Sequence, residues 1–130
     1  MRPAFSRVVF SNPDAAARAI ENLLSAERPQ FEENLAAALE ESPDPDIALV
    51  RLERFLAASH TPHLDLELMA AAPRYTRLVA TVLGQSHFLT DIVCRNPEYM
   101  MYLWEDADLA QTRTREDLVR EARSIVDLFD

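Results

Sequence analysis

The stretch Val82–Trp104, VLGQSHFLTDIVCRNPEYMMYLW, predicts the end of one helix and two further helices joined at a proline. Upstream of it, apolar residues recur at the spacing of a helix with one buried face. Gly84, the single glycine of the chain, is expected to end that helix, because the position after a helix favours a residue that reaches the left-handed region without a Cβ clash. Ser86 then caps a second helix, which is expected to bury Phe88 and Leu89 together with Ile92 and Val93.

A second cap is predicted where this helix stops, near Arg95. Asn96 supplies an accepting oxygen, and Pro97 supplies a preset φ at the first helical position, where no donor is needed. Met100, Leu103 and Trp104 form the apolar stripe of the helix that follows.

The rest of the chain repeats this pattern of helices that start at a proline. Helices are expected to begin near Pro13 and Pro45, and Pro29 is expected to break the first helix before a second one follows. A short helix over Leu64–Ala72 is ended by Pro73, and a last helix is capped by Thr114. Residues 1–10 are expected to form an extended arm that docks Val8, Val9 and Phe10, residues 60–63 a loop, and residues 106–113 a polar connector. The sequence predicts an all-α fold: a single domain over residues 1–130, an irregular array of about six to eight short helices with no sheet. Its helical subregions span about 11–59 and 62–130.

Composition narrows the class of protein. The net charge is −9, from 22 acidic residues against 13 basic ones, and an acidic chain repels nucleic-acid phosphates. Cys94 is the single cysteine, which excludes an internal disulfide and fits a reducing cytoplasm. No leader-type segment and no apolar run of about 20 residues is present. We therefore expect a cytoplasmic protein that binds neither nucleic acid nor membrane.

The central stretch also carries a longer motif, LGxSxFLxDxxxRxPE followed by LW. It resembles the early helical region of the adenylyltransferases that modify glutamine synthetase. The residues that match are Leu83, Gly84, Ser86, Phe88, Leu89, Asp91, Arg95, Pro97, Glu98, Leu103 and Trp104.

This resemblance implies a parent enzyme with nucleotidyltransferase domains that use ATP and Mg²⁺. In that family one domain attaches AMP to a tyrosine of glutamine synthetase, another removes it by phosphorolysis, and glutamine and a PII-type signalling protein control the balance. The catalytic acids of the family follow a Gly-Gly or Gly-Ser turn on a strand, and this sequence has no such turn. No catalytic, cofactor-binding or metal-binding residue is therefore carried over.

The resemblance thus implies a helical scaffold or inter-domain segment that is not catalytic by itself. Its partners would be later domains of its own parent chain. Because the apolar periodicity still runs at Asp130, we expect the N-terminal fragment of a longer multidomain protein. The alternative is a stand-alone helical domain for protein–protein interaction.

Two patterns of potential ligands occur near residue 63. Asp65 and Glu67 have the Asp-x-Glu spacing with which nucleotidyltransferases hold metal ions, but a helix-like run follows them, which favours first-turn helix acids. His60 and His63 with these acids offer a metal set for a small hydrolase, although structural zinc sites usually use cysteine or a better-defined spacing. Ordinary histidines in a solvated loop are the preferred interpretation.

Three further features concern the central stretch. Cys94 follows apolar residues on a helix, which predicts a buried and unreactive thiol. Asp91 and Arg95 are spaced for an ion pair along one helix, and Arg95 is also placed to reach Glu98. This set is expected to clasp two helices, with a surface that docks a neighbouring domain as the alternative.

Aromatic and sulfur-containing side chains are concentrated just after Pro97. The set is Tyr99, Met100, Met101, Tyr102 and Trp104. Helical spacing does not bury all of them on one side, so Met101 or Tyr102 is expected to be partly exposed at an interface.

Overall fold

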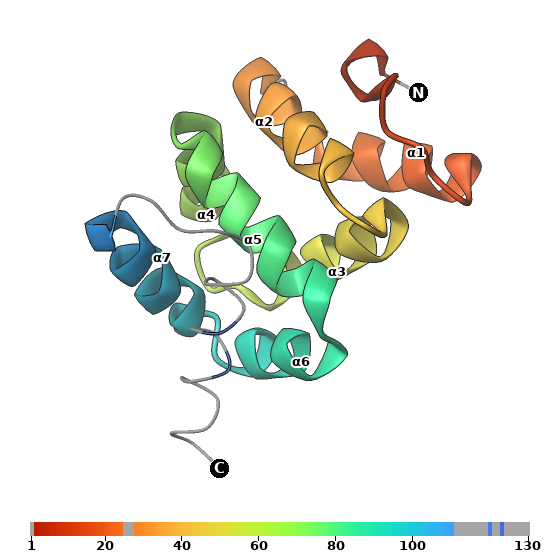
Figure 1. The fold of residues 1–130 in the computed structure, drawn as a ribbon. Helices are drawn as coiled ribbons and strands as arrows, with labels where there is room; N and C mark the ends of the chain where they lie inside the picture. Colours follow the sequence, from red (N-terminus) through yellow and green to blue (C-terminus); the bar gives the residue numbers. More distant parts are fainter. Residues whose placement is uncertain (1, 25–27, 111–119, 121–122, 124–130) are drawn as a thin grey trace.

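The polypeptide forms a layered array of short helices, shown in Figure 1 for a computed structural model. The structure describes residues 2–24, 28–110, 120 and 123. These residues contain seven α-helices, one turn of 3-10 helix and no strand, which confirms the predicted all-α fold. The elements are η1 (Pro3–Phe5), α1 (Pro13–Leu23), α2 (Pro29–Glu40), α3 (Pro45–Ala58), α4 (Pro62–Ala71), α5 (Pro73–Gln85), α6 (His87–Arg95) and α7 (Glu98–Ala110).

Local signals in the sequence account for the helix starts. Each helix from α1 to α5 carries a proline in its first turn, where a missing N–H costs nothing. Asn12 Oδ1 accepts a hydrogen bond from the Ala15 N–H at 3.2 Å, and Asp44 Oδ1 accepts one from the Ile47 N–H at 3.2 Å. These side-chain caps confirm the predicted starts of α1 and α3.

Residues 2–10 differ from the extended arm that was predicted for residues 1–10. They begin with the 3-10 turn η1, and the side chains of Phe5, Val8 and Phe10 are buried. Val9, which was expected to dock with its neighbours, is exposed to solvent. Consecutive side chains of an extended segment point to opposite sides, so burial of Val8 and Phe10 directs Val9 outward.

Helix α5 lies at the centre of the array and contacts α2, α3, α4, α6 and α7 (Figure 1). Helix α3 is the second hub, since it contacts α1, α2, α4, α5 and α6. Each large apolar side chain buried between these helices stabilises the fold by about 1.5–3 kcal/mol. Among the most deeply buried of them are Ile20, Phe31, Leu35, Leu39, Leu49, Phe55, Met69, Leu78, Val79, Val82, Leu83 and Met100.

One buried amide ties the end of α4 to α2. Asn34 Nδ2 donates hydrogen bonds to the carbonyl oxygens of Met69 at 2.7 Å and Ala70 at 3.1 Å. The last carbonyls of a helix have no partner within the helix, and α5 starts only two residues after α4 ends. The Thr76 hydroxyl of α5 donates to the same Met69 carbonyl at 2.8 Å. Asn34 and Thr76 together therefore satisfy the carbonyls of Met69 and Ala70 where the chain turns sharply from α4 into α5.

Helix α7 is the last helix among the described residues. This helix continues to Ala110, so the prediction of a polar connector is wrong for residues 106–110. The predicted cap at Thr114 and the helix after it lie outside the described residues. Over the described part of the chain, none of the helices has the length and apolar character needed to cross a membrane.

Candidate functional site

The motif LGxSxFLxDxxxRxPE begins at Leu83, near the end of α5, and continues through α6. Gly84 lies inside α5, one residue before its end, and its backbone is not in the left-handed region. The prediction that Gly84 ends the helix is therefore wrong. The chain leaves α5 at Ser86, whose φ of −154° and ψ of 128° are those of extended backbone.

Side chains from two other helices explain why no glycine turn is needed there. The carbonyl oxygen of Leu83 accepts a hydrogen bond from Arg51 Nη1 of α3 at 2.7 Å and lies 3.3 Å from the Thr90 hydroxyl of α6. Thr90 Oγ1 is also 2.9 Å from the carbonyl oxygen of Ser86. A helix normally satisfies such terminal carbonyls through a glycine turn, water or a basic side chain. Here Arg51 also places its positive charge at the negative end of the α5 dipole.

Helix α6 starts and packs largely as predicted. Ser86 Oγ accepts a hydrogen bond from the Leu89 N–H at 3.3 Å, which confirms the cap. Leu89 and Val93 are buried, one turn apart on the same face. The expected burial of Phe88 is wrong, because its side chain is 50% exposed. Adjacent residues of a helix are separated by about 100° around its axis, so burial of Leu89 turns Phe88 towards solvent.

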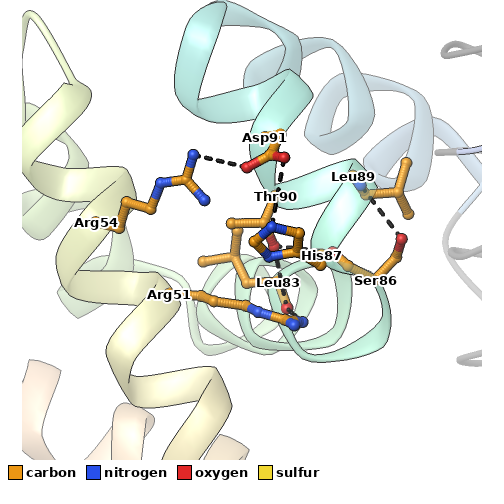
Figure 2. A network of polar contacts seen from close by, with 8 residues as sticks. All are labelled: Arg51, Arg54, Leu83, Ser86, His87, Leu89, Thr90 and Asp91. Atoms are coloured by element: carbon orange, nitrogen blue, oxygen red, sulfur yellow. Dashed lines mark hydrogen bonds and ion pairs between the residues drawn. The ribbon is translucent and has the colours of Figure 1, made fainter.

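Asp91 joins α6 to α3, as Figure 2 shows. Its Oδ1 atom lies 2.6 Å from Arg54 Nη2, and its Oδ2 atom lies 3.5 Å from Nε2 of His87, one turn earlier on α6. The predicted close ion pair between Asp91 and Arg95 is not formed, although the charge of Arg95 contributes to lowering the pKa of the Asp91 carboxyl. Among the described residues, Arg95 and Glu98 form no ion pair with each other, so the predicted clasp across Pro97 is replaced by one between α3 and α6.

The electrostatics of this network are those of a structural ion pair. The hydrogen bond from Arg54 holds the pKa of the Asp91 carboxyl below its ordinary value, and the charge of His87 acts in the same direction. A carboxylate held ionised in this way is a poor proton donor or acceptor near neutral pH. Burial raises the pKa of the partly buried Cys94 thiol, which fits the predicted unreactive cysteine.

The start of α7 places the aromatic and methionine residues on different sides. Met100 and Leu103 are buried, whereas Met101 is partly exposed and Tyr102 is 56% exposed, as the spacing predicted. Trp104 is half-buried: its ring meets the ring of Tyr75 edge-on, with centroids 5.4 Å apart, and the Arg74 guanidinium lies 5.9 Å from the indole centroid.

The potential metal ligands do not assemble into one site. No group of three or more histidine, cysteine, aspartate or glutamate side chains within the described ranges is placed to hold a metal ion. His63 lies in α4, not in the predicted loop, and Asp65 lies in the first turn of that helix, as expected. Asp65 is buried and accepts a hydrogen bond from the Ser59 hydroxyl.

A cavity that the sequence analysis missed lies beside Asp65. It measures about 310 Å³ and is lined by residues of the α3–α4 connection, α4, α5 and the α6–α7 junction. Asp65 and His60 line it, whereas His63 and Glu67 do not. No local signal in the sequence points to it, because its walls come from four parts of the chain.

Comparison with known proteins shows no relative: no family model, no curated protein and no solved structure matches this chain.

Proposed function

We propose that this chain is a helical scaffold and inter-domain segment of an enzyme of the glutamine synthetase adenylyltransferase type. The proposal rests on the motif from Leu83 to Trp104. Within the motif, the described side chains cap, pack and pair helices. In the proposed parent, the nucleotidyltransferase domains that use ATP and Mg²⁺ lie elsewhere in the protein, and glutamine synthetase and a PII-type protein are their partners.

The observation that carries the proposal is how the apolar motif residues are distributed. Leu83, Leu89 and Leu103 are buried in this chain, whereas Phe88 is half exposed. Aromatic side chains are enriched in protein interfaces relative to the rest of the protein surface. In the proposed parent, Phe88 packs against a later domain, while Ser86 and Asp91 fix the helix that presents it.

The first test reads the gene on both sides of this segment and assays its product. The proposal expects a downstream Gly-Gly or Gly-Ser turn followed by Asp-x-Asp on a strand, and transfer of AMP from ATP to glutamine synthetase. It also expects no heat when ATP and Mg²⁺ are titrated into the 130-residue chain. Saturable ATP binding by this chain would contradict the scaffold role and direct attention to Asp65 and Glu67.

A stand-alone interaction domain is the second candidate, and a different observation favours it. Ile47 and Val50 of α3 are exposed, in addition to Phe88 and Tyr102. Exposed apolar side chains on several helices suit a module that binds other proteins. A gene that encodes no nucleotidyltransferase sequence would support this candidate and overturn the first.

A further inference from the structure

The cavity beside α4 has the size and composition of a small-molecule site. Its volume of about 310 Å³ falls at the lower end of the range of about 300–1,000 Å³ that is typical of ligand pockets. The side chains that matter for its chemistry are Ser59, His60, Asp65, Tyr75, Glu98 and Met101. None of them belongs to the Arg54–Asp91 network, so the cavity is independent of the proposed scaffold role.

Asp65 gives the cavity its main chemical character. Its side chain is only 9% exposed, and aspartate is rarely buried so deeply unless it is paired. Ser59 donates to Oδ2, and Ser59 Oγ in turn accepts a hydrogen bond from the Thr61 N–H at 3.0 Å. This arrangement orients the carboxylate but does not neutralise it, since no ion pair joins Asp65 to an arginine or histidine among the described residues.

The walls of the cavity favour an organic cation over a metal ion or an anion. A carboxylate offers about four lone-pair sites, and the serine hydroxyl occupies one of those on Asp65. Glu98 is exposed and adds a second carboxylate at the same cavity, which repels anions. The residues do not form a group of three ligands suited to a metal.

The remaining wall of the cavity is formed in part by the aromatic ring of Tyr75 and the thioether of Met101. Tyr75 is buried, and its ring is held by edge-on contact with Trp104. Burial and the negative charge of Asp65 raise the pKa of Tyr75, which shows that its phenol stays neutral beside the carboxylate. Tyr75 is only 1% exposed, so it forms a closed wall of the cavity, whereas the partly exposed Met101 offers a polarisable apolar contact.

We propose that this cavity binds a small organic cation, a primary ammonium or a guanidinium with a short apolar chain. Asp65 is its counter-ion, Met101 contacts its apolar part against the wall that Tyr75 closes, and Glu98 strengthens the attraction at the rim. The acidic chain, with a net charge of −9, raises the local concentration of such cations.

The test uses NMR titration of the full chain with butylguanidinium and butylammonium, and with butylurea as a neutral probe of similar shape. Saturable shifts of the backbone amides of Thr61, Asp65 and Met101 are expected with the two cations and not with butylurea. Asp65→Asn, which keeps the size of the side chain and an oxygen for Ser59, is expected to weaken binding at least about tenfold, the loss of about 1.4 kcal/mol. No saturable shift with either cation, or equal shifts with butylurea, would overturn the proposal.

Two further variants compare the effect on binding of a carboxylate that lines the cavity with that of a carboxylate elsewhere on the surface. Glu98→Gln is expected to weaken binding by about two- to fivefold through the loss of one partly screened charge. Glu67→Gln removes the same charge from an exposed position of α4 outside the cavity and is expected to leave binding unchanged. An equal loss in both glutamine variants would overturn the site. If Asp65→Asn fails to fold, the comparison of the two glutamine variants still decides the result. A titration with MgCl₂ that shifts the same amides would overturn the proposal, because it would indicate a metal ion as the ligand.

Discussion

Replacing Gly84 with alanine is expected to stabilise the protein, although the sequence alone predicts the opposite. A glycine that ends a helix in the left-handed region resists substitution, because a Cβ atom there is strained. In the structure, Gly84 lies within α5 and has no such backbone conformation. A Cβ atom built on it would meet Ser42 Oγ at 3.6 Å and Ala48 Cβ at 3.8 Å, which are ordinary van der Waals distances.

The magnitude follows from helix propensity. Glycine in a helix interior is about 0.8–1.0 kcal/mol less favourable than alanine. Gly84 is the penultimate residue of α5, where part of this difference is lost, so the expected gain in the free energy of unfolding is about 0.5–1 kcal/mol. With an unfolding entropy of about 2.1 cal/mol/K per residue over 130 residues, the midpoint of thermal unfolding rises by about 2–4 °C.

Urea denaturation followed by circular dichroism at the helix band measures this change. The Gly84→Ala variant should shift the midpoint upward with an unchanged slope against urea concentration. Gln85→Gly is the matched control: it puts a glycine at the neighbouring exposed position of the same helix and should lower stability by up to about 1 kcal/mol. A loss of about 1 kcal/mol or more in Gly84→Ala would refute the reasoning, because it would require a left-handed backbone or a closer contact at this residue.

Four other substitutions test the packing and the ion pair. Leu89→Ala should lower the free energy of unfolding by about 2–5 kcal/mol, because it opens a cavity in the core. Phe88→Ala, at the half-exposed neighbouring position, should change it by no more than about 0.5 kcal/mol. Urea denaturation of the two variants measures both changes. Asn34→Ala should cost about 1–3 kcal/mol in the same assay, because it removes two hydrogen bonds and leaves the carbonyl of Ala70 without this donor, while the carbonyl of Met69 keeps its bond from the Thr76 hydroxyl. Asp91→Asn should lower the thermal midpoint at pH 7, and the difference from the parent should disappear as the pH falls through the lowered pKa of Asp91, since a carboxylate with a depressed folded pKa stabilises only while it is ionised. A deficit that persists below that pKa, where Arg54 has no charged partner in either protein, would contradict this assignment.

Helix starts were predictable because their causes are local. A capping side chain and a first-turn proline lie within four residues of the groups they serve, as Asn12 and Asp44 illustrate. Residues spaced by three and four likewise define the buried face of a helix, so Leu89, Val93 and Leu103 were placed correctly. The fold class therefore followed from the sequence.

The errors occur where a partner lies far away in the chain. Gly84 was expected to end α5 because the sequence does not show that Arg51 and Thr90 satisfy the carbonyl of Leu83. Asp91 was paired with Arg95 by spacing along one helix, but Arg54 of the crossing helix α3 lies closer. Contacts between helices depend on crossing geometry, which periodicity within one helix does not specify.

The cavity beside Asp65 was not predicted for the same reason, because residues from distant parts of the chain form it. The sequence grouped Asp65 with Glu67, but residues two apart on a helix lie about 200° apart around its axis and do not share a face. The fold instead brings Asp65 together with Tyr75 and Glu98 of the helices that follow. An acid that looked like an ordinary first-turn residue thereby becomes a candidate counter-ion, because its carboxyl group lies beside the cavity and no basic side chain of the described residues forms an ion pair with it. The chemistry at this position follows from burial, and burial is decided by how α4, α5 and α7 pack.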